Sequence, residues 1–253
     1  MGKYFAEQNP KLPFGLDLYA ESATALAALG TTITLADGRK YVYAKNGAAA
    51  VSIANLMTGV VPSVAHHTNV SVQATTAIKS TAVPITIGAT AVTVNQYAEG
   101  YLQINAPAGA SSGGYFYKIK DHALHAGSGT LTLNLYDETR FALTATTSKA
   151  TLVQHPCANF VVEVITTGVS FPLGVTIMPM TALYYGWLQV KGPCSVLVNG
   201  TLAVGGAVVP DVTAAGGVMA NAEAIYVGAE IGTCITISAT TTYGVINLSI
   251  PGF

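Results

Sequence analysis

Short segments in which apolar residues alternate with threonine, serine, asparagine or glutamine recur from about residue 70. Ile85 to Ile87, Tyr101 to Ile104 and Leu131 to Leu135 follow this pattern most regularly. Successive side chains of a β-strand point to opposite faces, so an alternating segment buries one face and exposes the other. The pattern predicts antiparallel strands with a polar but uncharged outer face. The same prediction applies to Val70 to Val72 and Val92 to Val94.

A β-hairpin is predicted near the N-terminus. Asp37-Gly38 lies between two strand-like segments, Thr31 to Leu35 and Lys40 to Ala44. An Asp-Gly pair accepts the backbone angles of a tight two-residue turn, and both flanking segments have strand composition. Two neighbouring stretches, 17–29 and the Ala-rich 48–57, instead predict short helical segments.

The chain after residue 156 carries the clearest strand and turn signals. Asn199-Gly200 stands between Ser195 to Val198 and Thr201 to Val204, which predicts a hairpin with positive φ at both turn residues. A second hairpin is predicted from Ala207 to Val218, through a loop with Pro210 and two glycines. Further strands are predicted at 225–227, 234–238 and 245–250. Such regularly spaced short strands predict a small barrel or sandwich.

These segments divide the chain into three parts. Residues 1–30 are mixed in character and are interpreted as an extended N-terminal arm. Residues 31–155 form a first β domain with a glycine- and serine-rich loop at 106–114. A composition shift at His155-Pro156 marks the start of the second β domain, residues 156–253. The predicted fold class is all-β, with two small antiparallel β-barrel or sandwich domains and the arm.

Charged residues are sparse. The 253 residues are 51% hydrophobic and only 9% charged, whereas about a quarter of an average globular protein is charged. Val164 to Val190 and the last 23 residues contain no Asp, Glu, Lys or Arg. Glycines and prolines interrupt the first stretch, so it is not interpreted as a membrane span. We expect other protein copies to cover much of this uncharged surface.

The net charge, the N-terminal sequence and the cysteines indicate which partners and which cellular compartment to expect. The net charge of −1 gives no electrostatic attraction to nucleic acid or anionic lipid, so neither is an expected partner. Lys11, Asp17 and Glu21 interrupt the N-terminal region, and no signal peptide is expected. The three cysteines have no CxxC spacing, and they are interpreted as buried, reduced thiols.

Several segments together resemble a known family. They are Thr90 to Leu102 (TAVTVNQYAEGYL), Tyr117 to His122 (YKIKDH), Tyr184 to Val190 (YYGWLQV), Gly192-Pro193 and Val204 to Pro210 (VGGAVVP). In order and spacing they resemble a family of tailed-phage virion proteins common among marine phages. The C-terminal half is also similar to small β-barrel capsid decoration proteins. The resemblance runs from about residue 31 to the C-terminus and implies a structural protein of the phage head, without catalysis.

Motifs for catalysis or metal binding are weak. His66-His67 and the pair His122 and His125 are the only closely spaced histidines, and a protein metal site usually needs a third and a fourth ligand. Asp137-Glu138 are adjacent, so on a strand their carboxylates point to opposite faces and cannot flank one bond. No nucleotide-binding or nucleophile motif is present. We therefore expect no enzyme activity, no catalytic or metal-binding residues and no cofactor.

Apolar and aromatic side chains provide the candidate interface. Strand alternation places Tyr185 and Trp187 on one face, which favours a core or inter-subunit contact over a sugar-stacking platform. The arm, residues 1–30, carries large apolar and aromatic side chains that do not alternate as in a strand. We expect these side chains to dock on a neighbouring subunit or on the shell. The arm anchors are Tyr4, Phe5, Leu12, Phe14, Leu16 and Leu18.

The expected function is that of a capsid decoration (cement) protein, which binds the outside of the phage head shell and stabilises it. Its partners would be the major capsid protein and further copies of itself, as a homotrimer or another homo-oligomer. The expected location is the virion, assembled in the host cytoplasm. Two alternatives remain open. One is another virion component, such as a tail, neck, fibre or shell protein, and the other is a carbohydrate-binding surface module.

Overall fold

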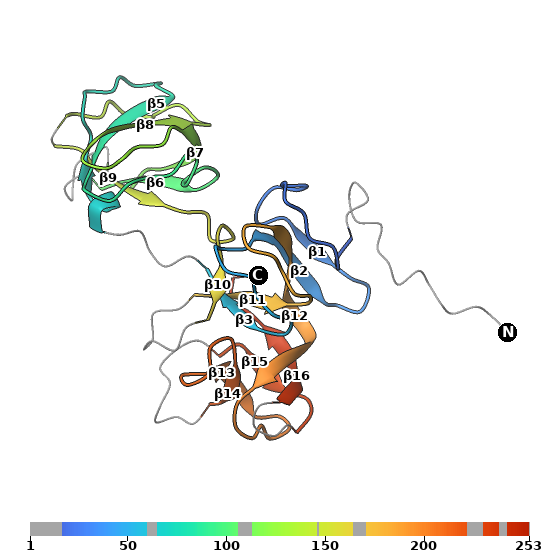
Figure 1. The fold of residues 1–253 in the computed structure, drawn as a ribbon. Coiled ribbons are helices and arrows are strands. Elements are labelled where there is room, and N and C mark those ends of the chain that lie inside the picture. The colour runs from blue at the N-terminus through green and yellow to red at the C-terminus, as the bar shows by residue number, and fades with distance from the viewer. Residues whose placement is uncertain are drawn as a thin grey trace. The chain divides into compact units, whose positions relative to one another are not determined.

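A computed structural model of the chain describes residues 17–59, 65–105, 113–145, 147–163, 171–221, 230–237 and 242–252. The chain is all-β and divides into two compact units (Figure 1). Unit 1 combines residues 1–60 with residues 156–253, and unit 2 is formed by residues 61–155. Unit 2 is thus inserted between two segments that fold together.

Unit 1 contains a ten-stranded sheet, part of which closes into a barrel. Strands β12, β14, β13, β15 and β16 form a closed ring, in which β12 pairs with both β14 and β16. The strands of unit 1 are β1 (Thr32–Thr34), β2 (Lys40–Lys45), β3 (Leu56–Thr58), β10 (Val161–Val162), β11 (Pro172–Thr176), β12 (Tyr185–Val198), β13 (Ala207–Pro210), β14 (Val218–Ala220), β15 (Gly232–Cys234) and β16 (Thr242–Ser249).

The long strand β12 organises unit 1. Its 14 residues pair with β2 and β11 along the first half and with β16 along the second half. Leu188 lies in the first half and Val196 in the second, and both are fully buried in the same hydrophobic core. One strand therefore joins the barrel to the sheet formed by β1, β2, β3 and β11.

Unit 2 is a six-stranded, nearly closed barrel in the order β4-β9-β6-β7-β8-β5. An isolated bridge between Val72 and Ile85 brings its two edges together. Its elements are the 3-10 turn η2 (Ala65–His67) and the strands β4 (Val70–Ser71), β5 (Ala82–Ile87), β6 (Tyr101–Ile104), β7 (Phe116–His122), β8 (Gly129–Leu135) and β9 (Lys149–Val153).

The alternating pattern predicts β4, β5, β6 and β8 correctly, whereas Val92 to Val94 contains only an isolated bridge at Val92. In β8, Leu131, Leu133 and Leu135 are buried, while the threonine and asparagine residues between them are exposed. The predicted strand at Tyr101–Ile104 is β6. All the strand pairs of this sheet are antiparallel. The prediction of a half-buried antiparallel sheet is confirmed, but its outer face is not uncharged, because β7 (Phe116–His122) carries exposed Lys120 and half-buried Lys118.

Two hairpin predictions are confirmed and one is wrong. β1 and β2 pair antiparallel around Gly38 (φ 86°), and β13 pairs with β14. The Asn199-Gly200 hairpin does not form, because β16 occupies one edge of β12 along Lys191–Val198 and β14 pairs with β12 at Val198. Gly200 has a positive φ of 83°, but Asn199 does not.

The predicted helical segments and the domain division also differ from the structure. Within the described residues, 17–29 and 48–57 contain turns and bridges but no helix. The division between His155 and Pro156 matches the predicted second boundary. Residues 31–60, which the sequence predicts to fold with 61–155, belong instead to unit 1, because β2 pairs with β12 and β3 pairs with β11. Within the described residues, no helix is long and apolar enough to cross a lipid bilayer.

Candidate functional site

The structure separates the predicted interface residues into two groups. Tyr4, Phe5, Leu12, Phe14 and Leu16 lie outside the described residues. The other three, Leu18, Tyr185 and Trp187, lie together in unit 1. Leu18 and Trp187 are 4% and 1% exposed, so neither side chain is available to a partner.

An aromatic cluster accounts for this burial. Tyr43 lies between Tyr185, whose ring is stacked at a centroid distance of 6.1 Å, and Trp187, whose ring meets it edge-on at 5.1 Å. Leu18 packs into the same cluster. Tyr185 and Trp187 therefore share one face, as the alternation predicts, and this face forms part of the core.

Residues 17–30 belong to unit 1. Ser22 and Tyr185 exchange two backbone hydrogen bonds of 3.0 and 2.8 Å. The backbone amide of Leu26 donates to the hydroxyl of Tyr43, at 3.0 Å. The carboxylate of Glu21 accepts hydrogen bonds from the backbone amide and the hydroxyl of Thr181. The expectation that the whole of 1–30 docks elsewhere is therefore wrong for its second half, which covers the aromatic cluster of its own chain.

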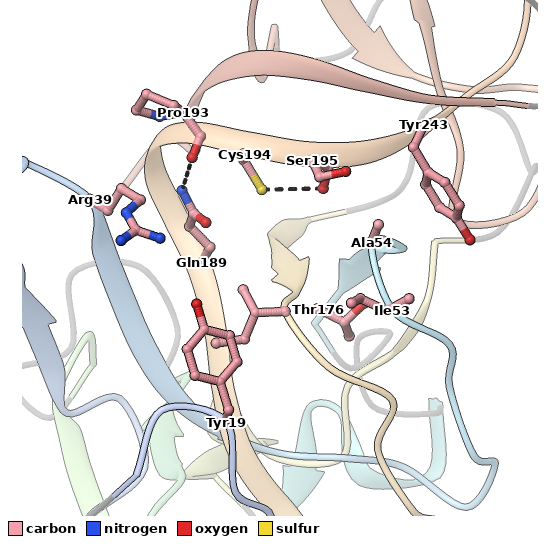
Figure 2. A pocket seen from close by; sticks show the side chains of 11 residues that line it. Tyr19, Arg39, Ile53, Ala54, Thr176, Gln189, Pro193, Cys194, Ser195 and Tyr243 are labelled. Atoms are coloured by element: carbon pink, nitrogen blue, oxygen red, sulfur yellow. Dashed lines mark hydrogen bonds between the residues drawn. The ribbon is translucent and has the colours of Figure 1, made fainter. Parts of the chain in front are cut away.

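A pocket of about 320 Å³ lies beside this segment (Figure 2). Three of its lining side chains are apolar or aromatic and exposed: Tyr19 at 60%, Ile53 at 44% and Tyr243 at 60%. The other lining residues are Arg39, Ala54, Thr176, Ile177, Gln189, Pro193, Cys194 and Ser195. The pocket is therefore assembled from segments that are widely separated in the sequence.

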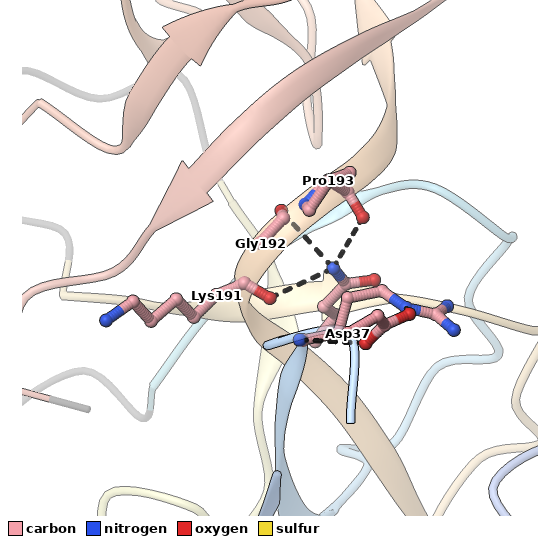
Figure 3. A network of polar contacts seen from close by, with 6 residues as sticks. Asp37, Lys191, Gly192 and Pro193 are labelled. Carbon is pink, nitrogen blue, oxygen red and sulfur yellow. Dashed lines mark hydrogen bonds and ion pairs between the residues drawn. The ribbon is translucent and has the colours of Figure 1, made fainter. Parts of the chain in front are cut away.

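An irregular point in β12 shapes one wall of this pocket. The side-chain amide nitrogen of Gln189 donates to the carbonyl oxygens of Lys191, Gly192 and Pro193, at 3.1, 3.4 and 2.8 Å (Figure 3). The register with β2 shifts at this point, and Gly192 has a φ of 87°, which disfavours other residues. Because the nitrogen is fixed in this way, the amide oxygen of Gln189 points towards the pocket (Figure 2).

Arg39 brings a cation to the pocket, and Asp37 neutralises it. The Nε of Arg39 lies 2.6 Å from Oδ2 of Asp37. Burial opposes ionisation of both groups, but their hydrogen bond and mutual attraction outweigh it, so the pKa of Asp37 is lowered and that of Arg39 is raised. This exposed pair contributes little to stability. It does hold the guanidinium group in place at the pocket wall.

Burial keeps two further groups at or near the pocket, Tyr41 and Cys194, in their neutral forms. Burial raises the pKa of the Tyr41 phenol to about 12 and that of the Cys194 thiol to about 12. The Cys194 thiol donates to the carbonyl oxygen of Ser195. A thiol in this state is a poor nucleophile. The pocket thus offers aromatic and apolar surface, one fixed acceptor and one paired cation, a combination suited to recognition.

The histidines of unit 2 participate in structural hydrogen bonds. His67 donates from Nε2 to the carbonyl oxygen of Thr90 (3.0 Å), and its Nδ1 accepts from the Tyr97 hydroxyl (2.6 Å). His122 accepts from the Tyr97 backbone amide (2.9 Å) and donates to the Ala123 carbonyl (2.8 Å). Both nitrogens of each ring are therefore engaged. Among the described residues, no group of three His, Cys, Asp or Glu side chains is placed to bind a metal.

The pocket residues Tyr19, Arg39 and Tyr243 are absent from the sequence-based interface. Each belongs to a different segment, and only the pairing of β12 with β2 and β16 brings these segments together. One local signal exists, because Gly192-Pro193 interrupts an otherwise apolar strand and marks an irregularity.

Comparisons with known proteins yield no match to a family model, to a curated protein or to a solved structure.

Proposed function

We propose that the protein is a non-catalytic structural component of a phage virion, a decoration protein that binds the outside of the head shell and stabilises it. The resemblance of its sequence segments to tailed-phage virion proteins motivates the proposal. The observation that carries it is the rim of the unit 1 pocket, where Tyr19, Ile53 and Tyr243 are exposed around a neutralised arginine.

This rim has the properties of an attachment point. The residues that carry most of the energy of protein interfaces are often aromatic and surround a desolvated pocket, and interface cores are depleted in charge. Arg39 is already paired with Asp37, so a partner can cover it without leaving an isolated charge. A projecting apolar side chain of the shell protein would fit between Tyr19 and Tyr243.

The barrel suits the same role. Its five strands close on themselves, so they offer no free edge for pairing with strands of other chains. Contacts made through the barrel then depend on side chains, which can be specific for one site on a shell. A protein that bridges shell subunits adds interface area at their junctions and needs no chemistry to stabilise the particle.

Cosedimentation with emptied heads that lack this protein tests the proposal. The full chain should pellet with the heads and saturate at a fixed number of copies. Replacing both Tyr19 and Tyr243 with alanine should weaken binding at least tenfold, about 1.4 kcal/mol. Leu124→Ala is the matched control, because Leu124 is 68% exposed and lies in unit 2. A full chain that stays in the supernatant with heads but pellets with tails would overturn the head assignment.

A further inference from the structure

Three rings form a column on the outer face of unit 2. The ring of Tyr101 on β6 stacks on that of Phe116 at a centroid distance of 4.4 Å and on that of His155 at 6.5 Å. β7 and β9 flank β6 on opposite sides, so the neighbours cover both faces of Tyr101. Phe116 ends the column and is 55% exposed. Its outer face is therefore open to solvent.

A second exposed ring belongs to Tyr136, which directly follows β8. Tyr136 is 51% exposed, and the ammonium group of Lys118 lies 5.4 Å from its ring centroid. Its hydroxyl donates to Glu99, whose other carboxylate oxygen lies 2.6 Å from Lys118. This ring is thus held in place by a cation and a carboxylate.

Hydrogen-bonding groups stand beside each ring. In the ladder between β6 and β7, exposed Gln103 lies directly opposite Phe116, and Lys118 lies directly opposite Tyr101. The amide of Gln103 therefore accompanies the first open ring, and the Lys118–Glu99 pair accompanies the second. We call these residues, Glu99, Tyr101, Gln103, Phe116, Lys118 and Tyr136, the aromatic surface of unit 2.

We propose that the aromatic surface of unit 2 binds a neutral oligosaccharide, with one sugar ring on Phe116 and another on Tyr136. A pyranose ring has an apolar face of C–H groups and an edge of hydroxyls. An aromatic face covers the first, while amide, carboxylate and ammonium groups bond the second. This site is separate from the pocket of unit 1 and does not depend on the proposed function.

The charges of this surface favour a neutral sugar over other occupants. Lys118 is neutralised by Glu99 at 2.6 Å, which leaves exposed Lys120 as the one further lysine of β7, whereas nucleic-acid binding requires several cations that are free to replace counterions. A protein partner would have to bury Lys118 and Glu99 at the centre of the interface, and lysine and glutamate are depleted there, whereas arginine, as in the pocket of unit 1, is enriched. Sugar hydroxyls can bond the same pair while it stays partly hydrated.

Calorimetric titration of the full chain with cellohexaose, maltohexaose and chitohexaose tests the proposal. At least one of these neutral probes should bind at millimolar concentration or below. Phe116→Ala and Tyr136→Ala should each weaken binding at least tenfold, whereas Tyr136→Phe, which keeps the ring, should weaken it less than fivefold. Phe171→Ala is the matched control, since Phe171 is 51% exposed, as Tyr136 is, but lies in unit 1 outside the pocket. The thermal melting of each variant establishes that unit 2 remains folded.

The proposal is overturned if none of the three hexasaccharides binds, or if the two alanine variants bind as tightly as the unsubstituted protein. Binding of an oligothymidylate that weakens steeply with salt, in place of sugar binding, would identify a nucleic-acid surface. Self-association that Phe116→Ala abolishes, again without sugar binding, would identify a contact between copies.

Discussion

The hydroxyl of Tyr97 donates a hydrogen bond to Nδ1 of His67 across 2.6 Å, with both side chains buried in unit 2. The backbone amide of the same tyrosine donates to His122, which is also buried. Tyr97 thereby links histidines on two different segments. Its backbone amide can donate to His122 only while the ring nitrogen that it meets is unprotonated.

Unit 2 should lose stability in mild acid. Burial lowers the pKa of His122, against weaker raising effects of the Ala123 carbonyl and of Asp121. Above the ordinary histidine pKa of about 6.5, neither the folded nor the unfolded chain binds this proton, and the stability is complete. As the pH falls below that value, the unfolded chain takes up the proton first, so stability decreases.

The measurement is the melting temperature of unit 2 between pH 7 and pH 5. We expect a clear decrease for the full chain and a smaller one for His122→Gln, whose amide can bond the same partners without titrating. His155 also has a pKa lowered by burial, so part of the decrease should remain. His66→Gln is the control, because His66 is exposed. An unchanged slope in His122→Gln would contradict this origin.

Trp187→Ala should destabilise unit 1 by about 3–5 kcal/mol, the usual cost of removing a buried tryptophan. The indole is 1% exposed and meets the ring of Tyr43. Chemical denaturation followed by circular dichroism measures the change. Tyr243→Ala, at an exposed position, should cost less than about 1 kcal/mol. Equal stability of the two variants would mean that Trp187 is not part of the core.

Two truncations should divide the N-terminal segment. Deletion of residues 2–16 tests the arm hypothesis, and deletion of residues 2–30 tests the covering role of residues 17–30. Deletion of residues 2–30 should lower its stability by at least about 2 kcal/mol, because Leu18 is buried and its side chain alone contributes that much. The original arm hypothesis stays a prediction for 1–16, namely that the shorter deletion weakens binding to heads. A shorter deletion that binds heads as tightly as the full chain would contradict it.

Gly200→Ala should cost about 1 kcal/mol, even though the hairpin is absent. Gly200 has a φ of 83°, and an added Cβ would meet nothing within 4 Å, so the cost comes from the backbone alone. The exposed neighbour Thr201 provides the control, as Thr201→Ala should be nearly neutral. Denaturant midpoints of the two variants measure the difference.

Thiol reagents should modify the folded protein very slowly. Burial raises the pKa of Cys157 and of Cys194 from 9.0 to about 12. The raised pKa leaves very little reactive thiolate near neutral pH, and burial adds steric protection. Ellman's reagent should therefore titrate these thiols only after denaturant is added. Rapid reaction in the native state would show that the cysteines are accessible.

The sequence predicts those strands whose side chains alternate between a buried and an exposed face. The alternation in Leu131 to Leu135 is readable because one face of β8 is buried and the other is exposed. β11 has five buried residues in succession, so it shows no alternation, and the sequence does not reveal it. Asn199-Gly200 is a strong turn signal, but the eight-residue ladder between β12 and β16 outweighs it. The local preference for a turn contributes less to the free energy of folding than a long, half-buried strand pairing does.

The pocket is less predictable than the strands for the same reason. Tyr19, Arg39 and Tyr243 become neighbours only through the pairing of distant strands, and no local pattern encodes that pairing. The aromatic residues of β12 were identified from the sequence as a cluster on one face. Their burial depends on residues 17–30, which cover them. The sequence of 17–30 has no periodic pattern that would predict this packing.

The insertion of unit 2 into unit 1 also sets an order of events during synthesis. All of unit 2 leaves the ribosome before β12 does, and β2 must wait for a partner that begins about 140 residues downstream. At 5–20 residues per second that delay is roughly 7–28 s. Unit 2 can complete its barrel within this interval, while the β1–β2 hairpin emerges with an unpaired edge. The nascent chain therefore carries its greatest risk of aggregation at its N-terminal end, where chaperone binding would have the largest effect on yield.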